Sequence, residues 1–170
     1  DIGKDKWNLN GKTVNFLDET DIRNLQISKG TLLPEERDII NEHIEITIDM
    51  LEKLPYPKNL RNVPEFAGGH HEKLDGTGYP RGLKEEEMST QAKIMAIADI
   101  YEALTAEDRP YKDGKKLSQA MKIMGYMKKD YHIDKDLFEI FVKSGVYKQY
   151  AKKYLSDSQL DKIDEASVLA

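Results

Sequence analysis

The chain has 170 residues, a length typical of one domain. Its 26 lysine and arginine residues against 31 aspartate and glutamate residues give a net charge of −5, which argues against a general nucleic-acid polymer or an anionic membrane surface as partner. Cysteine is absent, which excludes disulfides, thiolate metal ligands and cysteine nucleophiles. No segment reaches the ~18 consecutive apolar residues that a membrane span needs.

The first 33 residues are the least regular part of the chain. Gly11 and Gly30 interrupt their apolar positions, and Val14–Leu17 has the composition of a short strand. The chain begins at Asp1 without a methionine, which we interpret as a piece of a longer protein. We therefore expect an irregular N-terminal segment that has room for a short hairpin.

Helical patterns follow. Pro34 suits the first position of a helix, and apolar residues recur at helical spacing from there until Pro55. A second helix is expected over about 64–72, and the glycine-rich stretch 73–82 must be a loop. Ser89 is expected to cap a third helix over about 90–105, which is apolar nearly all round and therefore predicted to be buried.

The C-terminal third continues the helical pattern. Methionines on an amphipathic stripe over 117–127 are expected to fill the core. Asp134 is predicted to cap a further helix that ends at Gly145, and Val146, Tyr150 and Tyr154 indicate a last one. Together these patterns predict an all-α fold, a helical bundle.

Three of the four histidines lie at informative positions. His43 falls on the apolar stripe of the first long helix, where a histidine is by itself more often a hydrogen-bonded core residue than a ligand. His70 and His71 are adjacent, and neighbours on a helix point about 100° apart, so the pair can serve two metals rather than chelate one. Neutral imidazole is a common ligand of zinc, iron and manganese.

Asp99 is the sharpest anomaly in the sequence. It lies in the middle of the third helix among apolar residues, where an unpaired carboxylate costs several kcal/mol. A metal, a lysine partner such as Lys93 or Lys112, or an exposed bend would compensate for this cost.

The spacing of the histidines and Asp99 favours a metal ion over the other two ways to compensate for the Asp99 carboxylate. His43 precedes His70 by 27 residues, and His71 precedes Asp99 by 28, so three helices would each deliver ligands to one bundle core. Histidine and aspartate ligands suit a metal that activates water for hydrolysis.

Four ordered blocks then resemble one known family. His70–Pro80 reads HHEKLDGTGYP and is similar to the HHExxDGxGYP signature of HD-GYP domains. Residues 96–105 and 109–112 are similar to the family's AIADxxxALT and RPYK blocks, and residues 1–4 look like the tail of its HDIGK motif.

The resemblance implies a bacterial, cytoplasmic phosphodiesterase with an HD-type helical bundle. Its substrate would be cyclic di-GMP, its products pGpG, GMP or both, and its cofactors two or three divalent ions, iron or manganese. The implied metal ligands are Asp1, His43, His70, His71 and Asp99. Lys4 would contact the phosphate and act in catalysis with Asp1, while Arg109 and Lys112 would bind the anionic substrate. Tyr79 is expected to be exposed on the Asp75–Pro80 loop, which could contact other proteins.

The chain also departs from the family pattern, since the histidine before Asp1 and the upstream helices are missing. We interpret residues 1–170 as an HD-GYP catalytic domain truncated at its N-terminus, and we expect weak or no activity from this chain. We also expect its uncovered apolar surface to be hidden by self-association or by pairing with another chain. Two alternatives remain. A mononucleotide phosphohydrolase of the wider HD group is disfavoured by the Asp75–Pro80 signature, and a non-catalytic cyclic-dinucleotide receptor would bind without turnover.

Overall fold

The computed structural model describes residues 5–27, 33–107 and 114–170. It divides into two compact units, Asp1–His43 and Ile44–Ala170. The division falls inside the long helix α2 (Pro34–Glu52), so each unit contains part of that helix.

The first unit contains a β-hairpin. Strands β1 (Lys6–Leu9) and β2 (Lys12–Asn15) pair antiparallel, with Trp7 opposite Val14. Asn10 and Gly11 connect them with φ values of 52° and 81°, and two consecutive positive φ angles match the right-handed twist of a hairpin. The hairpin is confirmed, but its second strand lies two residues earlier than the Val14–Leu17 pattern suggested.

A short helix, α1 (Glu19–Leu25), follows the hairpin. Asp18 caps it by accepting a 2.7 Å hydrogen bond from the backbone N–H of Asp21, and the Asp21 carboxylate accepts one in return from the N–H of Asp18. No residue of α1 is buried, and neither are those of β1 and β2. This unit therefore has no apolar core among its described strands and short helix.

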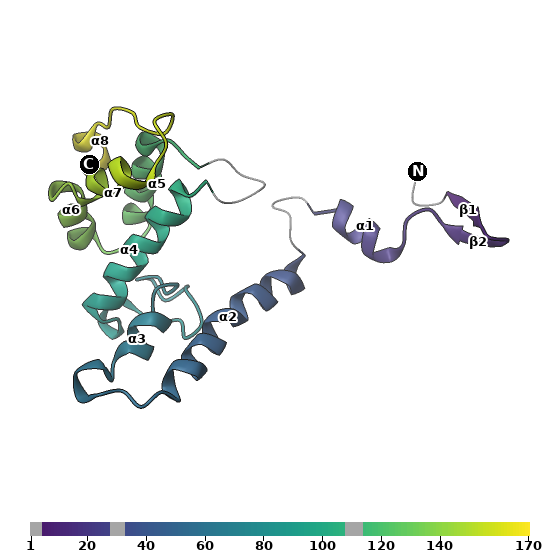
Figure 1. Cartoon of the computed structure of the whole chain (residues 1–170), viewed down its shortest axis with the longest axis horizontal. Coiled ribbons are helices and arrows are strands. Elements are labelled where there is room, and N and C mark those ends of the chain that lie inside the picture. The colour runs from purple at the N-terminus through teal and green to yellow at the C-terminus, as the bar shows by residue number, and fades with distance from the viewer. Residues whose placement is uncertain (1–4, 28–32, 108–113) are drawn as a thin grey trace. The chain divides into compact units, whose positions relative to one another are not determined.

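Among the described residues of the second unit, the regular elements are helices (Figure 1), in agreement with the all-α prediction, apart from one isolated bridge between Asp75 and Lys84. After the end of α2 its elements are η2 (Lys58–Leu60), α3 (Val63–Gly68), η3 (Glu85–Glu87), α4 (Thr90–Thr105), α5 (Leu117–Lys129), α6 (Lys135–Lys143), α7 (Val146–Tyr154) and α8 (Glu165–Leu169).

The core of this unit lies among helices α4 to α8. Met121 and Met124 are fully buried there, which confirms that methionines of this stripe fill the core. The Tyr101 hydroxyl donates a 3.0 Å hydrogen bond to the Tyr147 carbonyl oxygen, so the polar end of a buried ring is satisfied. The buried core members are Ile97, Tyr101, Leu117, Met121, Met124, Ile133, Phe138, Val142, Tyr147, Ala151 and Val168.

Helix α4 begins and ends where the sequence predicted, with Ser89 accepting a hydrogen bond from the N–H of Ala92. The expectation of burial all round was wrong. Ile94 and Met95 keep 51% and 40% of their surface exposed, because α3, α5 and α6 pack against only part of the helix circumference. Ile94 and Met95 therefore lie on an exposed face of α4.

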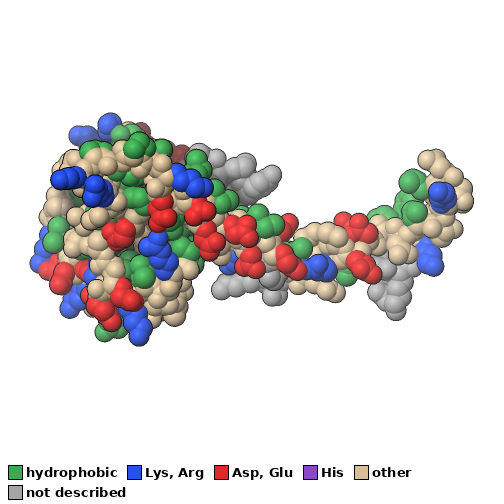
Figure 2. All heavy atoms as spheres, turned by 90° about the horizontal axis from the view of Figure 1, so that it is seen from below, with side chains coloured by type: hydrophobic (Ala, Val, Ile, Leu, Met, Phe, Trp, Pro, Cys, Tyr) green, Lys and Arg blue, Asp and Glu red, His purple; other side chains and the backbone are tan. Residues whose placement is uncertain are grey.

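The surface carries charges of both signs. Figure 2 shows lysine and arginine side chains interspersed with aspartate and glutamate on the visible face of the helical unit. Within the described residues, none of the helices is long and apolar enough to cross a membrane.

Candidate metal centre

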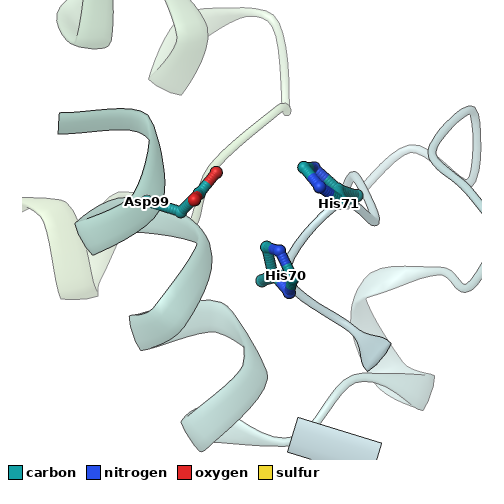
Figure 3. A group of neighbouring side chains, drawn as sticks. All are labelled: His70, His71 and Asp99. Atoms are coloured by element: carbon teal, nitrogen blue, oxygen red, sulfur yellow. The ribbon is translucent and has the colours of Figure 1, made fainter. Parts of the chain in front are cut away.

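Three of the predicted ligands lie together in the second unit. His70, His71 and Asp99 each offer a ligand atom, and these atoms all lie within 4.8 Å of one another. Figure 3 shows the Asp99 carboxylate extending from its helix toward the two imidazole rings. All three side chains are half-buried, so the group is shielded but accessible.

Two features of the chain bring this group together. Helix α3 ends at Gly68, and a Cβ atom on the following Gly69 would lie 2.8 Å from the Cβ of Ala92. The missing side chain of Gly69 therefore lets α4 approach the histidine pair closely. Asp99 lies two helical turns after Ala92 and so projects from the same face of α4.

The histidine pair is not on a helix, contrary to the prediction. Helix α3 ends at Gly68 instead of continuing to residue 72, because Gly68 and Gly69 are poor helix formers, and both histidines lie in the turn that follows. Their ring centroids are 4.2 Å apart with the planes inclined by 39°. The divergence of about 100° expected for helical neighbours does not apply, and both rings face the same carboxylate.

A backbone carbonyl group fixes the tautomer of His70 that can bind a metal. Its Nδ1 lies 2.6 Å from the carbonyl oxygen of Ala67, and a carbonyl oxygen can only accept, so Nδ1 carries the proton. In the neutral ring Nε2 then has the lone pair that a metal needs. A carbonyl partner of this kind commonly fixes a ligand histidine in proteins.

The lysine alternative for Asp99 is wrong for Lys93. The Lys93 ammonium lies 3.2 Å from the Asp134 carboxylate and 3.6 Å from that of Glu85, so it pairs with α6 and η3 instead. Lys112 lies outside the described residues.

Tyr79 belongs to the surroundings of this group. Its ring stacks on His71 with centroids 4.9 Å apart and planes inclined by 15°. Burial, and secondarily the negative charge of Asp99, raise the pKa of the Tyr79 phenol. The expectation that Tyr79 is exposed was wrong, since it is half-buried against a predicted ligand.

The structure does not place the remaining predicted site residues in this group. His43 lies in the first unit and is exposed, with Nδ1 donating to the carbonyl oxygen of Ile40, so the interpretation of His43 as a core residue is wrong. Its role as a ligand stays a prediction. Four further residues lie outside the described ranges: Asp1, Lys4, Arg109 and Lys112.

Glu72, which the sequence marked only as part of the signature, has a side chain that is 1% exposed. The sequence signal for its role was its position, directly after the two predicted histidine ligands and directly before the glycine-rich loop. The carboxylate accepts hydrogen bonds from two backbone N–H groups of that loop.

The donor atoms suit a divalent transition metal. Two imidazoles and a carboxylate are ligands that iron, manganese and zinc accept. Two ligand atoms on one ion lie at most ~4.2 Å apart, because each bond is ~2.1 Å long. The observed spread of up to 4.8 Å therefore requires small side-chain movements or ligation to neighbouring ions.

Several known proteins are similar to this chain over part of its length. The sequence profile of a family described as HD domain matches residues 20–137. A 3'3'-cGAMP-specific phosphodiesterase of Vibrio cholerae is 38% identical over 96 residues, which is 56% of this chain and 22% of the relative. A cyclic di-GMP phosphodiesterase of Thermotoga maritima is 41% identical over 96 residues, covering 56% and 26%, and one of Pseudomonas aeruginosa is 44% identical over 79 residues, covering 46% and 18%. The chain thus spans about a quarter or less of the length of these relatives.

Proposed function

Because this chain belongs to the HD domain family and carries the signature of its HD-GYP branch, we propose that it is part of a phosphodiesterase that hydrolyses cyclic di-GMP. The observation that carries the proposal is the convergence of His70, His71 and Asp99 within 4.8 Å. The names of similar proteins support a cyclic dinucleotide as the substrate class. In this proposal residues 1–170 form part of a single catalytic domain.

The proposed ligands act as a set. His70 binds through Nε2, because its Nδ1–H is engaged by Ala67, and Asp99 supplies a negative charge that offsets part of the charge of the ion. Asp1 and His43 are proposed to complete a centre of two or three iron or manganese ions. When bound, such ions acidify a water molecule and polarise the phosphoryl oxygens.

The reaction consumes one water molecule for each phosphodiester bond. The water oxygen forms a bond to phosphorus, the bond between phosphorus and the ribose O3′ breaks, and the water proton ends on that oxygen. One cleavage yields pGpG and a second yields GMP. Lys4, Arg109 and Lys112 are proposed to neutralise the phosphate oxygens, as cationic side chains commonly do.

A hydrolysis assay with cyclic di-GMP and added manganese or iron tests the proposal in the longest available form of the protein. His70→Ala and His71→Ala should each lower turnover at least ~100-fold, because displacing the reacting groups by about 1 Å already has that effect. His132→Gln is the matched control, since this histidine lies outside the group of three. Equal losses in all three variants would contradict the assignment.

Two further variants test the proposed contacts to the substrate. Arg109→Ala and Lys112→Ala should weaken turnover while leaving the metal content unchanged. Faster hydrolysis of 3'3'-cGAMP than of cyclic di-GMP would identify 3'3'-cGAMP as the substrate, with the type of reaction unchanged. Binding of either dinucleotide without product in every form would favour the receptor and overturn the enzyme.

A further inference from the structure

We propose that Glu72 is a positioning residue of the metal centre, which holds the 76–83 loop so that the ring of Tyr79 covers and orients His71. The inference rests on the proposed function, because it assigns a role toward the same centre. Glu72 itself is not part of the group of three residues that could hold an ion.

The carboxylate of Glu72 is engaged by the loop. Oε1 accepts a 2.7 Å hydrogen bond from the N–H of Arg81, and Oε2 accepts a 3.0 Å bond from the N–H of Leu83. The side chain is 1% exposed, and burial of a carboxylate is costly unless donors compensate for it. Two N–H donors to one charged group are among the stronger hydrogen bonds in proteins, so this pair fixes the far end of the loop.

The near end of the loop is seated on the backbone beside the histidines. A Cβ atom on Gly78 would lie 2.4 Å from the Cα of Glu72 and 2.3 Å from the N of Lys73, so only glycine allows this approach. The N–H of Tyr79 then donates a 3.3 Å bond to the carbonyl oxygen of His71. The loop is therefore attached on both sides of Tyr79.

The attached loop places the Tyr79 ring against the imidazole of His71. With the backbone held before and after Tyr79, its ring lies nearly parallel to that of His71 at a centroid distance of 4.9 Å. A ring stacked on one face limits the rotations available to the imidazole. Residues that orient a ligand in this way commonly change metal affinity when they are removed.

Metal affinity, measured by competition of cobalt(II) or manganese(II) with a chelator, tests the inference without relying on turnover. Glu72→Gln places an amide NH2 where an acceptor is needed, so one of the two bonds is lost while the size of the side chain is kept. We expect a fall in affinity of roughly 10- to 100-fold with an unchanged far-UV circular dichroism spectrum. Glu86→Gln, which alters an exposed glutamate of η3, is the matched control and should bind like the parent.

Two Tyr79 variants test the inference even if Glu72→Gln fails to fold, and the double variant adds a further test if it does fold. Tyr79→Phe keeps the stacked ring and should retain the parent affinity, whereas Tyr79→Ala should lose about as much as Glu72→Gln. If both residues act through one loop, the double variant Glu72→Gln/Tyr79→Ala should lose no more than either single one. Additive losses, or parent-like binding by Tyr79→Ala, would overturn the inference.

The outcomes also separate this inference from the proposed function. If the unsubstituted protein and Glu72→Gln bind metal equally well, the positioning role is wrong and the metal centre still stands. Parent protein that binds no metal removes the centre and the positioning role with it. Amide hydrogen exchange adds a readout independent of metal: faster exchange at Arg81 and Leu83 in Glu72→Gln supports the two hydrogen bonds, and unchanged exchange overturns them.

Discussion

The fourth histidine, His132, contrasts with the pair at the proposed metal centre. It is half-buried after the end of α5, and its backbone N–H donates a 2.9 Å bond to the Met127 carbonyl oxygen. Burial, followed by the positive charge of Lys73, lowers the pKa of its imidazole, while Asp75 and Asp130 act in the opposite direction. The folded chain therefore favours the neutral ring.

This preference predicts an acid-sensitive contribution to stability. Below the unfolded pKa of about 6.5, the unfolded chain binds a proton at His132 that the folded chain resists. The free energy of unfolding should consequently fall as pH drops through this range, and the contribution is fully present above it. In His132→Gln, urea unfolding between pH ~7.5 and ~5.5 should show a smaller loss of stability than the parent. A steeper loss in the variant would contradict the direction of the pKa shift.

At the level of residues, the sequence predicted the proximity of three polar side chains better than it predicted what surrounds them. The convergence of His70, His71 and Asp99 followed from their types and spacing. The pairing of Lys93 with Asp134, 41 residues away, depends on how α4 and α6 pack, which no local pattern encodes. The same holds for Tyr79, whose ring reaches His71 only because the loop folds back.

At the scale of the helices, Asp134 both caps the N-terminus of α6 and forms an ion pair with Lys93 of α4. Asp134 accepts 3.0 Å hydrogen bonds from the N–H groups of Asp136 and Leu137, and its other oxygen lies 3.2 Å from the Lys93 ammonium. Both partners of the ion pair are largely buried, with 13% and 14% of their side chains exposed. One side chain thus fixes the start of α6 against α4.

Two substitutions separate these contributions. Asp134→Ala removes cap and charge together and should lower the free energy of unfolding by roughly 2–4 kcal/mol. Asp134→Asn keeps a good capping residue but removes the charge, so it should lose less. Equal losses in urea unfolding would show that the cap contributes nothing measurable beyond the ion pair.

Element boundaries were predicted well where a cap or a proline marks them, as at Pro34, Ser89 and Asp134. The dipeptide Asn10–Gly11 is a strong hairpin signal that outweighs the break suggested by the glycine. Helix α1 was not predicted, although Asp18 and Asp21 cap its start reciprocally. The early end of α3 follows from the poor helix propensity of Gly68 and Gly69, a local signal that the prediction of a helix to residue 72 underweighted.

For the helical unit as a whole, metal binding should raise stability. An ion that binds only the folded state at 100 times its dissociation constant contributes about 2.7 kcal/mol. For a domain of this size we expect manganese to raise the melting temperature by roughly 5–10 °C. A chelator should reverse the shift, and the double variant His70→Ala/His71→Ala should abolish it. A shift that survives this double substitution would place the stabilising ion elsewhere.

The two units should also unfold separately, and the position of the single tryptophan makes this measurable. Trp7 lies in β1, stacks on Phe16 at 5.5 Å and keeps 59% of its surface exposed. A two-stranded hairpin without a buried face is only marginally stable in water, whereas α4 to α8 share a buried core. During urea unfolding, far-UV circular dichroism should show a cooperative helical transition, while Trp7 fluorescence changes gradually and without a step at the same midpoint. Coincident sigmoidal transitions would contradict this expectation, because they would require the hairpin to share the cooperative core of the helices.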